Sequence, residues 1–132
     1  MSCSSPSADS AGGYVSFAEY ESACVAGVRY QVVRMSFARR LDLMRRVREV
    51  AQRIEFLDAG NDARDKIESS VLGAEIDRMY LEWGLQSVEG LTIDGELASP
   101  SLLIERGPEA LAREIVGRIR AECHLSEDER KN

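Results

Sequence analysis

Among all residues of the chain, an adjacent cysteine and histidine, Cys123 and His124, are best suited to chemistry. A thiolate and an imidazole can ligate a metal ion, and Cys24 could add a third ligand if the fold brought it close. Three ligands without a fourth favour the simpler interpretation, a surface histidine beside a half-buried thiol. A cysteine nucleophile with a histidine base is disfavoured as well, because adjacent helical positions do not face each other.

Carboxylates and glycines form no pattern that requires an active site. The paired carboxylates are Glu75 with Glu82 and Asp94 with Glu96. A solvated acidic surface accounts for both pairs. The glycines that could suggest a phosphate-binding loop are Gly84, Gly90 and Gly95. Each of them has a helix-terminating, bulge or turn role, so no nucleotide is implied. The sequence predicts no catalytic residue, no metal and no cofactor, and we expect a protein that is not an enzyme.

Arginines form the one group that could carry a binding function. The net charge of −6 divides into −3 for residues 1–26, +5 for 27–57 and −8 for 58–132. The basic block contains Arg39, Arg40, Arg45, Arg46, Arg48 and Arg53. Such a block predicts either an anionic partner or neutralisation by the chain's own acidic surface, in the same or a neighbouring subunit. Because the charge surrounds the polar side of one helix and aromatic residues are few, an interface with an acidic protein is favoured over nucleic acid.

Composition indicates one soluble globular domain. The chain has 132 residues, of which 44% are hydrophobic and 30% charged. It has no apolar run near the roughly 20 residues that cross a bilayer and no basic-then-apolar export signal, so we expect neither membrane insertion nor secretion. Three cysteines without paired spacing predict reduced thiols in the cytoplasm. We expect a flexible Ser/Gly-rich tail over residues 1–13 and a single α+β domain over 14–132.

A β-hairpin is expected first, with arms of roughly Tyr14–Val25 and Val28–Met35. Apolar and polar residues alternate in the second arm, which is typical of a half-buried strand. A helix is the alternative for the first arm, because Phe17, Tyr20 and Cys24 also have helical spacing.

Two long amphipathic helices follow, joined by the short break Gly60-Asn61. Ser36 and Asp62 are the expected N-caps, and Gly60 and Gly84 end the helices. The apolar stripe of the first is Leu43, Val47, Val50, Ile54 and Leu57, with Met44 and Ala51 beside it; that of the second is Leu72, Ile76, Met79 and Trp83, with Ile67, Val71 and Tyr80 beside it. A connection this short requires the two helices to run antiparallel.

A second hairpin and shorter helices complete the predicted order ββααββαα, an α+β fold. Val88, Leu91 and Ile93 lead into a two-residue turn at Asp94-Gly95, and 96–98 form the return arm. Ser99-Pro100 begins a short helix over 102–105, and Gly107-Pro108 precedes another that carries Leu111, Ile115 and Ile119.

The last eight residues contain a helix start of their own. Ser126 is followed three residues later by Glu129, which is the capping-box spacing. This predicts either a frayed turn at the end of the chain or a short form of a longer polypeptide.

Four segments resemble small proteins encoded in the tail modules of bacteriophages and prophages: MSFARRLDLMRRVREVAQRIEFLDAG, YLEWGLQSVEGLTIDGE, IERGPEALAREIVGRI and LSEDERKN. The resemblance is to tail assembly chaperones of long-tailed phages and spans most of residues 28–132. It implies binding to the tape measure protein and to tail tube subunits in the host cytoplasm. It also implies, in many members, a second product made by ribosomal frameshifting. The family has mainly helical folds, from which the expected N-terminal hairpin departs.

The first hypothesis is therefore a non-enzymatic tail assembly chaperone. Its client would bind the apolar residues Leu43, Val47, Val50 and Ile54 and the arginines around them. The same apolar residues could instead fill the core of the monomer. The alternatives are a minor phage structural protein and a small nucleic-acid-binding regulator that uses the Arg-rich helix 39–53. Amphipathic helices and segments of opposite charge also make a homo-oligomer plausible.

Overall fold

The computed structural model describes residues 12–60 and 62–131, with side chains as far as Cys123. Along the chain the elements are β1 (Phe17–Glu21), β2 (Arg29–Val33), α1 (Phe37–Asp58), α2 (Ala63–Gly84), β3 (Leu85–Glu89), β4 (Thr92–Ile93), β5 (Glu96–Leu97), α3 (Pro100–Arg106) and α4 (Glu109–Lys131). Strands and helices are both present and follow the expected sequence of hairpin, long helices, strands and helices. The α+β fold class is confirmed.

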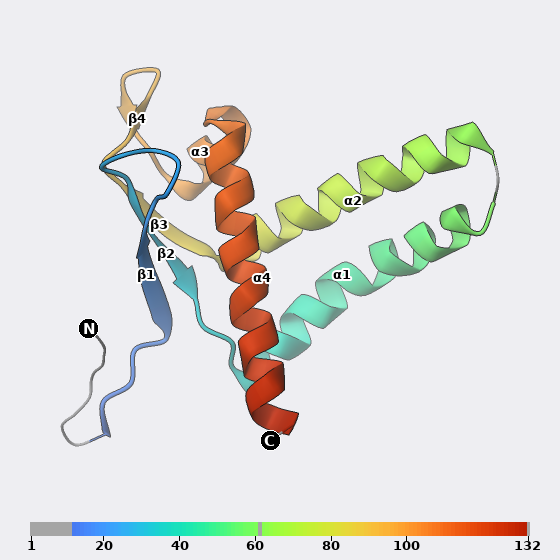
Figure 1. Cartoon of the computed structure of the whole chain (residues 1–132), viewed down its shortest axis with the longest axis horizontal. Coiled ribbons are helices and arrows are strands. Elements are labelled where there is room, and N and C mark those ends of the chain that lie inside the picture. Colours follow the sequence, from blue (N-terminus) through green and yellow to red (C-terminus); the bar gives the residue numbers. More distant parts are fainter. Residues whose placement is uncertain (1–11, 61, 132) are drawn as a thin grey trace.

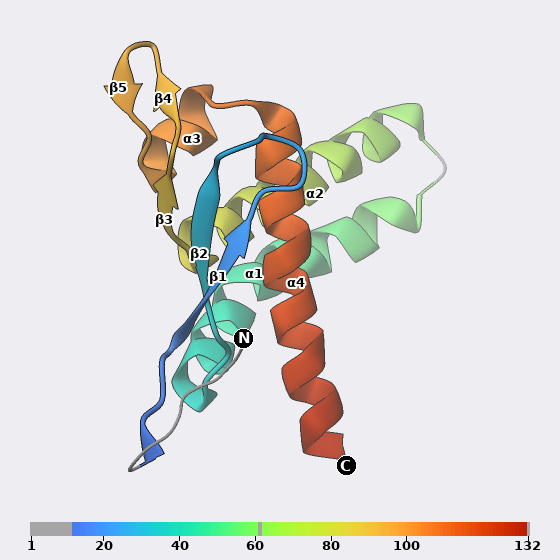
Figure 2. The same cartoon turned by 60° about the vertical axis from the view of Figure 1, so that its left-hand side comes forward.

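A three-stranded antiparallel sheet, in the order β1-β2-β3, forms one layer of the fold. Tyr30 on the central strand β2 lies opposite Tyr20 on β1 and Val88 on β3. The register between β2 and β3 shifts between Gln31 and Val32, where Leu85 pairs with Val32. Figure 2 shows α4 crossing one face of this sheet.

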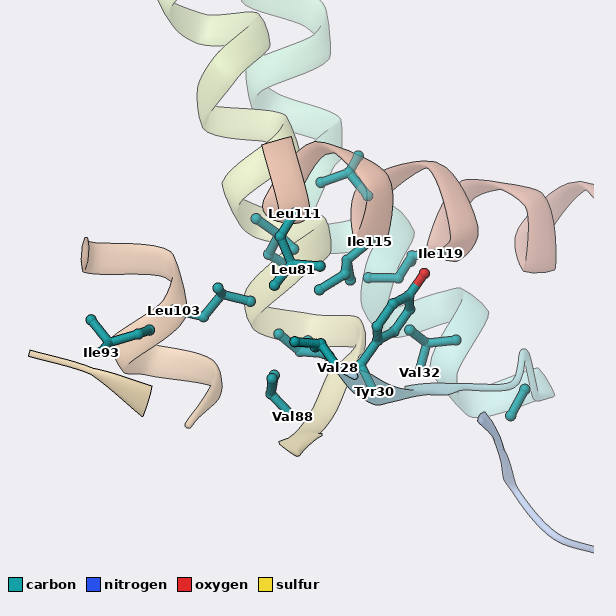
Figure 3. Close-up of a cluster of buried hydrophobic side chains, with 13 residues drawn as sticks. Val28, Tyr30, Val32, Leu81, Val88, Ile93, Leu103, Leu111, Ile115 and Ile119 are labelled. Carbon is teal, nitrogen blue, oxygen red and sulfur yellow. The ribbon is translucent and has the colours of Figure 1, made fainter. Parts of the chain in front are cut away.

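The main hydrophobic core lies between the sheet and α4. Leu111, Ile115 and Ile119 are fully buried and recur every four residues, so they form one stripe along α4. This stripe packs over the β2 side chains Tyr30 and Val32, as Figure 3 shows. Val28 and Val88 from the sheet, Leu81 from α2, Ile93 from β4 and Leu103 from α3 complete the labelled cluster.

The helices α1 and α2 form an antiparallel hairpin, here called the arm, which projects away from the sheet and α4 in both views (Figures 1 and 2). Both predicted N-caps are present: Ser36 Oγ accepts from the backbone N–H of Arg39 at 3.2 Å, and Asp62 Oδ1 accepts from that of Arg64 at 3.1 Å. Each satisfies an otherwise unpaired N–H of the first turn, which explains why the helices begin at these residues.

The arm has its own narrow seam, separate from the main core. Leu43 and Val50 on α1 and Leu72 on α2 are buried, yet the described core cluster contains no residue of α1. From α2 the cluster contains Leu81, and the partly buried Tyr80 and Trp83 pack against it. Helix α1 is thus held mainly by α2, whereas α2 also contacts α3 and α4 over the half that is nearest the sheet.

The second hairpin is smaller than expected, because Val88 belongs to β3 of the main sheet. Gly90, with φ +83°, turns the chain out of β3 and lies so close to Gly27 that a Cβ would overlap its carbonyl oxygen. The hairpin proper is β4 with β5, joined at Asp94 (φ 52°) and Gly95 (φ 83°). Two successive positive φ angles confirm the predicted turn.

Other sequence-based boundaries need correction. Strands β1 and β2 of the first hairpin have five residues each and are shorter than the expected arms. Because β1 is a strand, the helical alternative for the first arm is excluded. No new helix begins at Ser126, since α4 continues through it to Lys131. His124 therefore lies within α4. No glycine or proline interrupts the chain between Ile119 and Ser126, so the hydrogen bonding of α4 continues.

Two further expectations concern the termini and membranes. Most of the tail expected over residues 1–13 lies outside the described residues. Within the described chain, no helix combines the length and apolar character needed to cross a lipid bilayer.

Candidate protein-binding surface

The two cysteines singled out for metal binding lie in different environments. Cys123 is buried, whereas Cys24 is exposed in the turn after β1. The described residues contain no group of three or more His, Cys, Asp or Glu side chains placed to hold a metal ion. The side chain of His124 lies outside the described part.

The paired carboxylates show no joint site either, because one member of each pair forms an ion pair with an arginine. Glu82 Oε2 accepts from Arg78 at 3.0 Å, and Asp94 Oδ2 accepts from Arg106 at 3.1 Å, both at the surface. Glu75 lies on the rim of a groove described below. Ion pairing and solvation account for these groups.

A polar cluster between the sheet and α4 was missed by the sequence analysis, because its members lie far apart in the chain. Glu114 accepts from Tyr30 Oη at 2.7 Å, from Ser22 Oγ at 3.0 Å and from the backbone N–H groups of Ala23 and Cys24 at 3.1 and 3.2 Å. Tyr20 Oη donates to Glu122 Oε2 at 2.7 Å. This cluster ties the β1–β2 turn and both tyrosines to α4.

Protonation in this cluster suits a structural role. Burial and the hydrogen bond to Glu122 raise the pKa of Tyr20 to about 12, and burial and Glu114 raise the pKa of Tyr30. Burial by itself would raise the pKa of Glu114, but its hydrogen bonds from Tyr30 and from the turn lower it to about 2. Near neutral pH the two phenols therefore stay protonated and donate, and the Glu114 carboxylate stays ionised and accepts.

Three of the predicted binding arginines are used within the molecule. Arg39 donates to the backbone carbonyls of Ser16 and Arg34 at 2.8 and 3.0 Å, and so ties α1 to the hairpin. Arg40 donates to the carbonyl of Cys123 at 3.4 Å, linking α1 to α4. The third, Arg46, forms an ion pair with Asp42 at 3.0 Å, one turn back on α1.

The other three arginines, Arg45, Arg48 and Arg53, are exposed and form no ion pair with any described residue. Such exposed arginines could pair with acidic groups of a partner without first breaking an ion pair to a described residue. Arg45 and Arg48 lie one turn apart, so their charges add on one side of α1.

The predicted apolar client-binding residues mostly face α2. Leu43 and Val50 are buried and Val47 and Ile54 are half-buried, because these positions form the seam of the arm. This is the core role that the sequence left open for them.

A different apolar stripe of α1 is exposed. Phe37 is 84% exposed, Met44 56% and Leu41 42%. Steps of four and three residues place them along one face of the helix, which Arg48 continues one turn beyond Met44 and Arg45 flanks. We call these five residues the α1 stripe: Phe37, Leu41, Met44, Arg45 and Arg48. The helical spacing of its apolar residues is present in the sequence, but the sequence analysis assigned the binding role to the longer apolar stripe that packs on α2.

A groove of about 580 Å³ is lined by residues of α2, α3 and α4. Its apolar lining consists of Val71, Ala74, Leu81, Ile104, Ala112, Val116 and Gly117. Ion pairs along its rim join Arg120 to Asp77 at 2.8 Å and Arg113 to Glu109 at 2.6 Å. Arg78 on the same rim also pairs with Glu105. The groove is thus apolar at its floor and nearly neutral at its edge.

Comparisons with models of protein families, with curated proteins and with solved structures found no match to this chain. The surfaces described above are therefore the basis for any assignment of function.

Proposed function

We propose that this protein is a non-enzymatic assembly chaperone that holds an amphipathic, acidic helix of a client protein along the α1 stripe. The apolar side chains Phe37, Leu41 and Met44 would bury the client's apolar face. Arg45 and Arg48 would pair with acidic residues at its edge. This is the helix-on-helix mode of recognition, in which anchors spaced by three and four residues face one another.

The observation that carries the proposal is the combination of exposed apolar groups with unpaired cations on one helix face. Large apolar side chains that gather on a surface mark an interaction site more often than isolated ones do. The unpaired arginines beside them favour an acidic partner over a purely apolar one, since charge complementarity adds specificity and speeds association.

The architecture of the arm supports the same function. Because α1 contributes no described residue to the main core cluster, a client helix can lie against α1 without displacing any element of that core. A third helix would add to the small seam of the arm. Client binding is therefore expected to stabilise the arm as well as the client.

The resemblance to tail assembly chaperones supplies the expected client. Tape measure proteins are very long, and those chaperones bind them and the tail tube subunits before assembly. We propose the same partners here, with binding in the cytoplasm of the host cell. A minor structural role in a phage particle is the nearest alternative, and it differs in that the protein would stay in the finished particle.

The test is co-expression of this chain with the proposed client, a tape measure protein of a long-tailed phage, followed by affinity purification. Wild type should retain the client, and both Met44→Glu and the double variant Arg45→Gln/Arg48→Gln should lose at least tenfold in affinity. Arg46→Gln is the matched control, because Arg46 lies on the opposite side of α1 and already pairs with Asp42.

Two outcomes would overturn the proposal. One is client binding that survives all three substitutions of the α1 stripe. The other is binding of DNA or RNA, lost steeply as salt is raised, which would favour the nucleic-acid alternative.

A further inference from the structure

A second surface, on the other helix of the arm, points to self-association. Ile67 is 67% exposed and Val71 49% exposed on α2, although both are aliphatic. Steps of four, three and four residues align Ile67, Val71, Ala74 and Arg78 on one face of α2. The distal part of this face, which is farthest from the sheet and includes Ile67, is exposed to solvent. The proximal part, nearer the sheet, lines the 580 Å³ groove.

The groove has small residues on its α4 side, which would let another helix approach closely. Its α4 wall presents Ala112, Val116 and Gly117. A Cβ at Gly117 would have no described atom within 4 Å, so nothing inside the monomer requires a glycine there. Glycine within a helix costs about 1 kcal/mol relative to alanine. A helix packed against the groove would explain this residue, since an absent side chain lets two backbones come close.

The charges along α2 select the partner. Arg64 near the start of the face and Glu75 near its middle are both exposed, and neither side chain forms an ion pair with any described residue. In two antiparallel copies of α2, each Arg64 would lie near Glu75 of the other copy. That register places the two-fold axis close to Ser70 and brings Ile67 of one copy against Val71 and Ala74 of the other. In this register Arg64 and Glu75 are complementary in charge, and the apolar side chains of the two copies face one another.

We propose that two copies of this chain form a symmetric dimer in which the distal half of α2 of each copy fills the α2–α4 groove of the other. The contact is isologous, so every pairing occurs twice and the assembly closes at two subunits. It goes beyond the client-binding function, because it uses α2 and α4 and leaves the α1 stripe free.

The first test measures mass by light scattering and sedimentation over a range of protein concentrations. The expected result is a reversible monomer–dimer equilibrium. Arg64→Glu and Glu75→Arg should each raise the dimer dissociation constant at least tenfold, because each places two like-charge pairs in the interface. The double variant should restore most of the affinity. A charge-matched control, Glu89→Arg on β3, should leave the equilibrium unchanged.

A second variant separates dimerisation from folding. Gly117→Gln should raise the melting temperature of the monomer or leave it unchanged, because the side chain enters open space and glutamine favours helix. It should also weaken the dimer at least tenfold by filling the groove. A protein that stays monomeric at all concentrations would overturn the proposal. A dimer indifferent to the charge exchange and to Gly117→Gln would overturn it equally.

Discussion

Replacing Glu114 by glutamine tests whether one carboxylate fastens α4 to the sheet. This side chain accepts four hydrogen bonds, from Tyr30, Ser22 and the backbone of Ala23 and Cys24, and its pKa falls from 4.5 to about 2. A fall of that size corresponds to about 3.4 kcal/mol of stability at neutral pH, at 1.36 kcal/mol per pKa unit. Glu114 is only half-buried, so solvent screens its carboxylate, and we expect the Glu114→Gln variant to lose about 2 kcal/mol.

The dependence on pH gives the sign of the effect. Because the folded-state pKa is depressed, the stabilisation is present above the unfolded value of 4.5 and is lost as pH falls towards 2. The gap between wild type and Glu114→Gln should therefore be full at pH 7 and small near pH 2.

The assay is urea unfolding followed by circular dichroism and by the fluorescence of Trp83, at pH 7 and at pH 2.5. Glu109→Gln is the matched control on the same helix, because Glu109 forms only a surface pair with Arg113 and its removal should cost under about 0.5 kcal/mol. Equal losses for Glu114→Gln and Glu109→Gln, or a Glu114→Gln loss that persists undiminished at pH 2.5, would refute the reasoning.

Three further predictions concern packing, backbone and protonation. Leu72→Ala should destabilise the protein by about 2–4 kcal/mol in urea unfolding, because Leu72 is buried in the seam of the arm, whereas Leu41→Ala should change stability by under about 1 kcal/mol. A similar loss for both would show that the two positions are equally packed. Gly90→Ala should destabilise by more than about 2 kcal/mol, since alanine is strained at φ +83° and its Cβ overlaps the carbonyl of Gly27; a neutral effect on the thermal melt would contradict the β3 turn geometry. In an ultraviolet titration, Tyr20 should ionise near pH 12 while the protein stays folded, and Tyr20→Phe should remove that step; its ionisation near pH 10 would exclude the hydrogen bond to Glu122.

Local sequence signals predicted the elements of this fold well. Ser36, Asp62 and Ser99 cap helices because their short side chains can accept a nearby backbone N–H, and this depends only on adjacent residues. The turn at Asp94-Gly95 is local in the same sense. The α+β class followed from these signals together with apolar periodicity.

Signals that depend on distant parts of the chain were missed. The pairing of β3 with β2 joins residues more than fifty positions apart, so the apolar pattern around Val88 fitted the nearer hairpin equally well. The capping box at Ser126 is a valid local signal, but α4 was already continuous at that point. A helix that is already formed has no unpaired N–H groups for such a box to satisfy.

The candidate surface was predicted in part. The arginine block was found, and the structure divides it into internally bonded arginines and cations without an ion pair to any described residue, because only the fold decides which carbonyls and carboxylates lie within reach. The client-binding stripe expected at Leu43 and Val50 packs against α2, because the main apolar stripe of an amphipathic helix faces the interior of the fold. Phe37, Leu41 and Met44 are exposed on another face of α1, which is where we propose that a client binds.

Methionine methyl NMR offers the most direct test of client binding by the α1 stripe. Met44 lies in the α1 stripe and is 56% exposed, whereas Met79 is half-buried on α2. On titration with a helical segment of the tape measure protein, the Met44 methyl signal should shift progressively and saturate, while the Met79 signal should stay in place. A client that binds without moving the Met44 signal, or that moves only Met79, would contradict binding at the α1 stripe.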